Sequence, residues 1–215
     1  MMRNDGPMTR EGFDTASLVL GPMLRWVDDD SATVWVETSA PCSVEVLGHV
    51  TRTFQVERRH YALVIVTGLG PGSTTPYEVH LDGRAVWPDQ DADVPPSVIR
   101  TTGSHGTVRV LLGSCRAAAP HEVPYTQDLA FDPEGRGVDT LWAHARRIMT
   151  QDCELWPTLM VFAGDQIYAD DSSPKARERI EAWRADALDL DASKVYDFEE
   201  YCWLYHEAWS SGSER

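Results

Sequence analysis

The sequence is short of basic residues. Its 215 residues include 19 Lys and Arg against 34 Asp and Glu, which gives a formal net charge of −15 at pH 7. Such a charge repels the phosphates of nucleic acids and of anionic lipids, so we expect neither as a partner. Hydrophobic residues make up 42% of the chain, which is enough for a folded core and excludes a disordered chain.

Long apolar runs and paired cysteines are also missing. The first residues are polar, and no stretch is long enough for a signal peptide or a membrane-spanning helix. The four cysteines are far apart and form no C-x-x-C pair, which fits a reducing compartment better than a disulfide framework or a zinc knuckle. We therefore expect a cytoplasmic protein that does not bind membranes.

The common catalytic motifs are absent as well. The sequence contains no P-loop, no dinucleotide-binding glycine fingerprint, no G-x-S-x-G elbow and no H-E-x-x-H helix. Cys115 does not fit a cysteine phosphatase, because that mechanism needs an arginine six positions later and the residue there is His121. These absences exclude several large enzyme classes.

The first half of the chain has the pattern of an all-β domain. Between residues 16 and 100, short alternating runs are broken by turn residues, which predicts strands over 24–27, 32–37, 44–47, 53–56, 62–66, 77–81 and 84–87. Asp82 and Gly83 between the last two predict a type I′ hairpin, whose central residues both need a positive φ. About seven such strands indicate an immunoglobulin-like or fibronectin-like β-sandwich over residues 15–100.

The pattern changes after a polar, Pro- and Gly-rich stretch at residues 89–106. Residues 108–112 and 158–163 are short apolar runs that predict buried strands, and residues 138–149 between them carry apolar side chains at helical spacing. A strand, a helix and a second strand in this order indicate a βαβ unit, and hence a parallel sheet.

Two further helices are expected near the end of the sequence. Ser173 and Pro174 are an N-cap and a first helical residue, which predicts a helix from Lys175 to about residue 188. Asp197 begins the other helix, with a capping box and an apolar face formed by Phe198, Tyr201, Cys202, Tyr205 and Trp209.

Three side chains follow the two predicted parallel strands. Cys115 comes just after the first strand, Asp165 just after the second, and Tyr168 three residues later. Because the carboxyl ends of parallel strands lie at one edge of a sheet, we expect these residues to converge there as ligands for an ion such as iron. Each also has an ordinary alternative, as a small buried hydrophobe, a helix cap and a packing aromatic respectively.

Residues 111–116, 161–170 and 201–206 resemble successive motifs of the PhoD-like (alkaline phosphatase D) metallophosphatases. The G-D-x-I-Y-x-D sequence within the second segment is the most specific of them. Members of that family carry a fibronectin-like domain before the catalytic domain. The resemblance implies a two-domain α+β chain, with a fibronectin-like sandwich over 15–100 and the N-terminal portion of an α/β metallophosphatase domain over 105–215.

The resemblance also implies an activity and a metal site. It implies a metal-dependent phosphoric ester hydrolase in which Cys115, Asp165 and Tyr168 ligate an iron and Asp165 also reaches a calcium. Arg116 lies beside this site in the sequence and is a candidate for binding the substrate phosphate. A surface arginine is the alternative.

The family's later ligands have no counterpart in the sequence. They lie in an Asp-Asp-His-Asp-like block and in His-containing motifs, and none of the 7 histidines here belongs to such a block. We therefore expect a truncated domain that binds one ion weakly, hydrolyses aryl phosphates near background, and self-associates or is completed by another polypeptide. The alternative is a catalytically inactive chain whose β-sandwich acts as a binding module.

Overall fold

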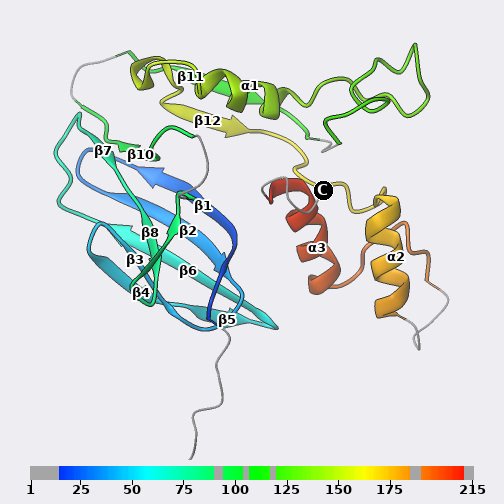
Figure 1. Ribbon diagram of the computed structural model, residues 1–215, viewed down its shortest axis with the longest axis horizontal. Helices are drawn as coiled ribbons and strands as arrows, with labels where there is room; N and C mark the ends of the chain where they lie inside the picture. The colour runs from blue at the N-terminus through cyan, green and yellow to red at the C-terminus, as the bar shows by residue number, and fades with distance from the viewer. Residues whose placement is uncertain (1–14, 90–93, 104–106, 117–119, 185–189, 211–215) are drawn as a thin grey trace, which may run out of the picture.

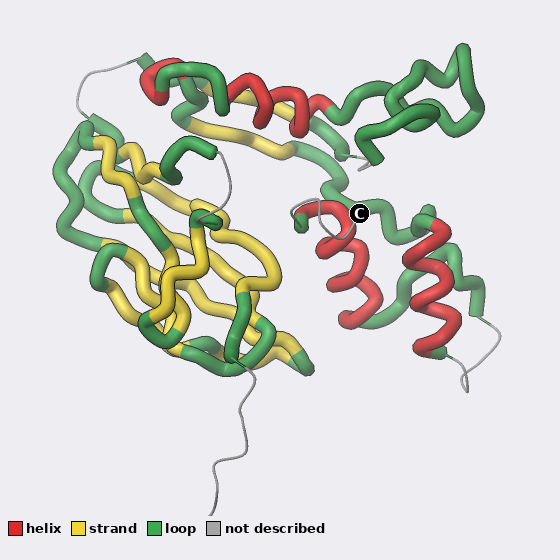
Figure 2. Tube along the Cα trace, viewed as in Figure 1, coloured by secondary structure: helices red, strands yellow, loops and turns green. Residues whose placement is uncertain are grey.

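A computed structural model describes residues 15–89, 94–103, 107–116, 120–184 and 190–210. These residues form an α+β fold with β-sandwich sheets and three α-helices (Figure 1). Figure 2 shows the sandwich strands gathered on one side, with α2 and α3 on the other. Within these ranges, no helix has the length and apolar content needed to span a lipid bilayer.

The sandwich consists of two four-stranded antiparallel sheets and a short strand pair. The first sheet has the order β1-β2-β6-β5 and contains β1 (Leu18–Val27), β2 (Ala32–Thr38), β6 (Arg59–Val66) and β5 (Phe54–Val56). The second has the order β4-β3-β8-β9 and contains β4 (His49–Arg52), β3 (Ser43–Val46), β8 (Val79–Leu81) and β9 (Arg84–Trp87). Strands β7 (Thr74–Pro76) and β10 (Val98–Arg100) form the pair.

Alternating side chains of the two sheets form the core of the sandwich. Val34 and Val64 of the first sheet, and Val44 and Leu81 of the second, are at most 1% exposed. Ile99 of β10 is part of the same cluster and is fully buried. The alternation that predicted these strands therefore reflects side chains turned in turn toward the core and toward the surface, whereas β4, β7 and β10 were not predicted.

Tight turns join the strands of the second sheet. Asp82 and Gly83 have φ angles of 48° and 80°, which confirms the hairpin predicted from this dipeptide. Leu47 and Gly48 adopt the same combination, with φ angles of 50° and 79°, between β3 and β4. The predicted strand over 44–47 therefore ends one residue early, because Leu47 belongs to the turn.

A parallel strand pair follows the sandwich. Strands β11 (Val110–Gly113) and β12 (Leu159–Phe162) pair in parallel, with α1 (Thr140–Ile148) and a short 3-10 helix (Cys153–Leu155) between them. This confirms the βαβ unit. The expectation that both strands are buried was wrong: Leu112 is 71% exposed and Leu159 is 51% exposed. No other described strand pairs with them, and α1 itself has no buried residue, so their side chains are only partly covered.

The last two helices pack against each other and confirm their predicted starts. In α2 (Pro174–Trp183), the Ser173 hydroxyl accepts a hydrogen bond from the Ala176 amide at 3.0 Å. Residues 185–189 of the helix expected to end near residue 188 lie outside the described residues. Helix α3 (Phe198–Trp209) begins with the predicted capping box between Asp197 and Glu200.

The predicted apolar face of α3 was wrong at three of its five residues and right at Cys202 and at Trp209, whose half-buried ring packs against Phe162. Phe198, Tyr201 and Tyr205 are 39% to 42% exposed, whereas the buried residues are Glu200, Cys202, Trp203, Leu204 and Ala208. The reason is that α3 is covered from two sides. Trp203 and Leu204 pack with Ile180 of α2, while the Cys202 thiol meets the hydroxyl of Tyr61 on the sandwich at 3.6 Å.

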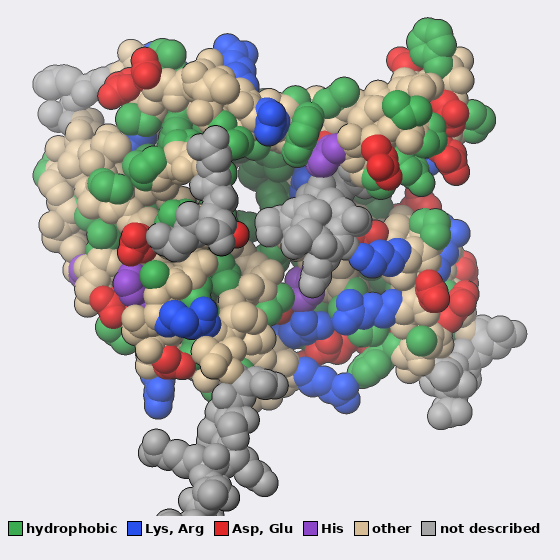
Figure 3. All heavy atoms as spheres, in the orientation of Figure 1, with side chains coloured by type: hydrophobic (Ala, Val, Ile, Leu, Met, Phe, Trp, Pro, Cys, Tyr) green, Lys and Arg blue, Asp and Glu red, His purple; other side chains and the backbone are tan. Residues whose placement is uncertain are grey.

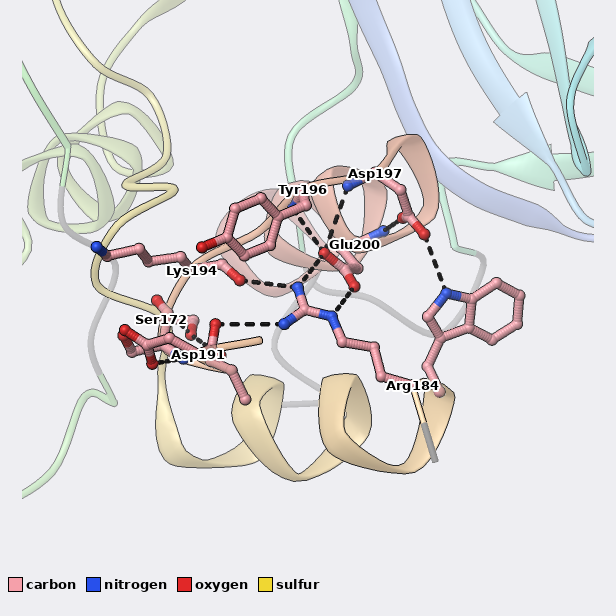
Figure 4. Close-up of polar contacts among 10 residues, drawn as sticks. Ser172, Arg184, Asp191, Lys194, Tyr196, Asp197 and Glu200 are labelled. Atoms are coloured by element: carbon pink, nitrogen blue, oxygen red, sulfur yellow. Dashed lines mark hydrogen bonds and ion pairs between the residues drawn. The ribbon is translucent and has the colours of Figure 1, made fainter. Parts of the chain in front are cut away.

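A buried ion pair joins α2 to α3 (Figure 4). The Arg184 guanidinium donates two hydrogen bonds of 2.6 Å to Glu200, whose side chain is 2% exposed. Glu200 also accepts hydrogen bonds from the Tyr196 and Asp197 amides, at 2.7 and 3.4 Å. Because every contact on this carboxylate is a donor, its charge is compensated inside the helix pair.

A second buried carboxylate joins α3 to the sandwich. Glu37 at the end of β2 is 2% exposed and lies 3.4 Å from Arg59 Nη1 and 2.9 Å from His206 Nε2. Arg59 also donates to Glu199 of α3, with Nη2 at 2.7 Å. The contact between sandwich and helix is therefore largely ionic.

We expect Gly83→Ala to lower the free energy of unfolding by about 1 kcal/mol, because a side chain at a φ of 80° is strained even though the space around Gly83 is open. Gly70→Ala is the matched control, since a Cβ there meets only ordinary contacts at 3.7 Å and its φ is not left-handed. Urea unfolding measures both. Equal destabilisation by the two substitutions would contradict the turn assignment.

We expect Arg59→Met to lower the free energy of unfolding by about 2–3 kcal/mol, because it leaves Glu37 and Glu199 without their shared cation. Arg52→Met is the control: Arg52 is exposed and donates only a 3.3 Å hydrogen bond to Ser43, so its loss should change stability by less than about 0.5 kcal/mol. Thermal and urea unfolding of both variants would reveal the difference, and its absence would show that the ionic contact is dispensable.

Candidate metal centre

The ends of β11 and β12 are joined by backbone contacts. The Ala163 amide donates to the Gly113 carbonyl at 2.9 Å, and the Arg116 amide donates to the Asp165 carbonyl at 2.8 Å. The Gln166 side-chain amide donates to the carbonyls of Ser114 and Gly164, at 3.2 and 3.0 Å. The two loops that follow the strands therefore form one rim.

Gly164 allows this close approach. A Cβ at this position would lie 2.8 Å from the backbone nitrogen of Cys115 and 2.9 Å from its Sγ. Real Cβ atoms do not tolerate such distances, so only glycine lets the second loop pass directly against the first. The Cys115 thiol is thereby held beside the residue that precedes Asp165.

The structure places all three predicted ligand residues on this rim, with the Cys115 thiol beside the Tyr168 hydroxyl. Cys115 and Tyr168 are within hydrogen-bonding reach of each other, and the carboxylate of Asp165 acts electrostatically on both. Cys115 and Asp165 are exposed, and Tyr168 is 36% exposed. The ordinary alternatives of a buried hydrophobe for Cys115 and a helix cap for Asp165 do not fit, because the next helix after Asp165 starts at Pro174.

Hydrogen bonding favours the thiolate form of Cys115. Donation from the Tyr168 hydroxyl, then from the Asp165 backbone and from Ser114, lowers the pKa of Cys115 below its usual value. The same hydrogen bond raises the pKa of Tyr168, since the phenol must keep its proton to donate it. Cys115 is therefore the first of this pair to become an anion as the pH rises.

Arg116, the predicted substrate-binding residue, is engaged in contacts within the fold. Its side chain is 11% exposed; Nη2 donates to Asp139 at 3.1 Å, Nη1 donates to the Ala208 carbonyl, and the guanidinium lies 4.8 Å from the centre of the Trp209 ring. Its Nε atom is buried without a hydrogen-bond partner among the described residues. The substrate-binding role of Arg116 stays a prediction.

Asp139 was missed by the sequence analysis, although it supports the rim through Arg116. It caps α1 by accepting hydrogen bonds from the Leu141 and Trp142 amides, at 2.9 and 3.1 Å. Burial alone would raise its pKa, but these hydrogen bonds and the Arg116 charge hold the pKa below its usual value. An Asp directly before an apolar helical pattern is the signal that identifies such a cap.

An acidic cluster elsewhere does not belong to this rim. Among the described residues, Asp28, Asp29 and Asp30 are the one group of three His, Cys, Asp or Glu side chains close enough for a single ion. They lie in the turn between β1 and β2, where Asp28 accepts hydrogen bonds from Ser31. These bonds, the one from the Ser31 hydroxyl foremost, lower the pKa of Asp28 and explain it as a turn residue.

Comparison with known proteins gives one match. A family model described as "Domain of unknown function (DUF7800)" matches residues 15–99, which contain the strands of the sandwich up to the start of β10. No curated protein and no solved structure matches the chain.

We expect Tyr168→Phe to raise the pKa of Cys115, because the substitution removes the hydroxyl that stabilises the thiolate. The measurement is the rate of iodoacetamide alkylation of Cys115 against pH, read by mass spectrometry at this cysteine alone. The midpoint should move to higher pH in Tyr168→Phe and stay in place in Tyr205→Phe, which changes an exposed tyrosine of α3. An unchanged midpoint in Tyr168→Phe would show that the two side chains do not interact.

Proposed function

We propose that this chain contributes the ion-holding rim of a metal-dependent phosphoric ester hydrolase of the alkaline phosphatase D type. The observation that supports this most directly is the convergence of Cys115, Asp165 and Tyr168 at the carboxyl ends of two parallel strands. Ligand sites in open parallel sheets lie at this edge. The sequence resemblance to that family rests on the same three residues.

The donor set fits an iron ion. A thiolate, a phenolate and a carboxylate are all anionic donors when deprotonated, and anionic donors of this kind suit a trivalent or borderline cation. A calcium beside it would share the Asp165 carboxylate, as the resemblance implies. Such ions, when bound, supply Lewis acids for a phosphate oxygen and for a water molecule. The remaining ligands of a two-ion centre would come from outside the described residues.

The chain's own side chains orient and prepare this rim. The Tyr168 hydroxyl donates a hydrogen bond to the Cys115 sulfur beside Gly164, and it would have to release this proton to serve as a phenolate ligand. The Gln166 amide bridges the two loops through backbone carbonyls, which ties the loop that carries Asp165 to the loop that carries Cys115. Exposure of Asp165 and of Tyr168 leaves the rim open to a phosphate ester.

The proposal is tested by equilibrium dialysis of the chain against ferric iron, with metal analysis of the protein. We expect weak binding of about one ion, lost in Asp165→Asn because a carboxylate donor is removed. Gly164→Ala should weaken binding by about tenfold or more, since its Cβ displaces Cys115. Gly113→Ala is the matched control, because a Cβ there meets only the Phe162 ring at 3.5 Å.

Equal iron binding by the unchanged chain and by Asp165→Asn would overturn the proposal and leave the sandwich binding module as the alternative. Hydrolysis of an aryl phosphate with added iron and calcium is the second measurement. We expect it near background for this chain, since three donors hold one ion. Robust turnover that Asp165→Asn abolishes would establish the hydrolase and contradict only the one-ion expectation.

A further inference from the structure

One loop projects from the fold with apolar side chains at its tip. Residues 120–137, here called the acidic loop, lie between the end of β11 and α1 and extend away from the sandwich (Figure 1). Phe131 is 84% exposed, Leu129 is 66% exposed and Val123 is 68% exposed. Figure 3 shows hydrophobic and acidic side chains gathered at this projecting corner.

The acidic loop is rigidly built by its own hydrogen bonds. The Arg136 amide donates to the Tyr125 carbonyl and the Gly137 amide to the Gln127 carbonyl, both at 2.9 Å, so the two limbs of the loop are joined. A Cβ at Gly135 would lie 2.6 Å from the Gln127 carbonyl oxygen, which shows how closely the limbs approach. The two limbs below the exposed tip are therefore tied to each other by backbone hydrogen bonds.

Side-chain caps hold the tip itself. The Asp128 carboxylate accepts a hydrogen bond from the Ala130 amide, and the Asp132 carboxylate accepts one from the Glu134 amide, each at 2.8 Å. These two turns direct Leu129 and Phe131 outward from either side of Ala130. A rigid aromatic anchor of this kind loses little conformational entropy on binding, which is the property of interface hot spots.

The negative charge around the tip indicates that the partner surface is basic. The acidic loop carries four acidic residues and one arginine, and the Arg136 guanidinium donates to carbonyls of its own loop at 3.0 and 3.3 Å. A complementary surface therefore needs an apolar face for Phe131 and Leu129 that is bordered by Lys or Arg, as on a basic amphipathic helix. Anionic lipid surfaces do not meet that requirement, because they repel the same carboxylates.

We propose that the acidic loop is a protein-docking element that packs Phe131 and Leu129 against the apolar face of a basic amphipathic helix on a partner protein. This role is independent of the phosphoester proposal, since it uses none of the ligand residues. The carboxylates of Asp128 and Asp132 steer the approach of the partner, and the two apolar side chains supply the buried contact.

The test uses the full chain and a fluorescent amphipathic helical peptide built of leucine and lysine, titrated by anisotropy. Phe131→Ser should weaken binding by about tenfold or more. Phe54→Ser is the matched control, because Phe54 is also a phenylalanine with 52% exposure but lies on the sandwich, and it should leave the affinity unchanged. Unfolding curves should be the same for Phe131→Ser and the unchanged chain.

The double variant Asp128→Asn, Asp132→Asn tests the contribution of the two negative charges to binding. It keeps the conformation of the loop, since asparagine retains the oxygen that accepts the capping hydrogen bond. We expect it to weaken binding and to reduce its dependence on salt. The proposal fails if Phe131→Ser and Phe54→Ser have equal effects, or if a peptide with glutamate in place of lysine binds as well. It also fails if phosphatidylcholine vesicles, or a second copy of the chain in sedimentation, bind through Phe131 instead.

Discussion

The arrangement of the chain depends on the burial of the Glu37 carboxylate. This side chain lies near the end of β2 in the sandwich, where Arg59 of β6 compensates its charge and His206 Nε2 of α3 lies 2.9 Å away. A carboxylate buried in this way is strongly unfavourable unless its cationic partners are held in place. Helix α3 must therefore stay against the first sheet, and Arg59 reinforces the contact by binding Glu199 of the same helix.

Two other arginines also bind partners on α3, so this helix contacts several parts of the fold. Arg184 joins α2 to α3 through Glu200, and Arg116 joins the rim after β11 to the carboxyl end of α3 through the Ala208 carbonyl and the Trp209 ring. The Trp209 ring also meets Phe162 of β12 at 5.7 Å between ring centres. The candidate metal centre is thus positioned relative to the sandwich through α3 and through Arg100 of β10, which donates to the Cys153 and Trp156 carbonyls before β12, rather than by a continuous apolar core.

The sequence predicted those features that depend on local chemistry. The Asp82-Gly83 hairpin, the Ser173 cap and the parallel order of β11 and β12 follow from backbone preferences and spacing, and Cys115 and Asp165 meet because parallel strands end at one edge. Whether a side chain is buried depends on which other elements pack against it, and a local sequence pattern does not contain that information. For that reason the burial of part of α3 and of strands β11 and β12 was predicted wrongly. The Leu47-Gly48 turn was not predicted, because leucine rarely adopts a positive φ.

The ion pair between Arg116 and Asp139 couples the formation of α1 to the ordering of the loop that carries Cys115. Asp139 satisfies the first free amides of α1, and the same carboxylate binds the arginine that follows Cys115. Fraying of the first turn of α1 would remove the carboxylate partner of the arginine, and loss of the arginine would weaken the cap. The helix and the loop bearing the thiol should therefore order together as one cooperative unit, so that no stable intermediate has α1 formed while the Cys115 rim is still open.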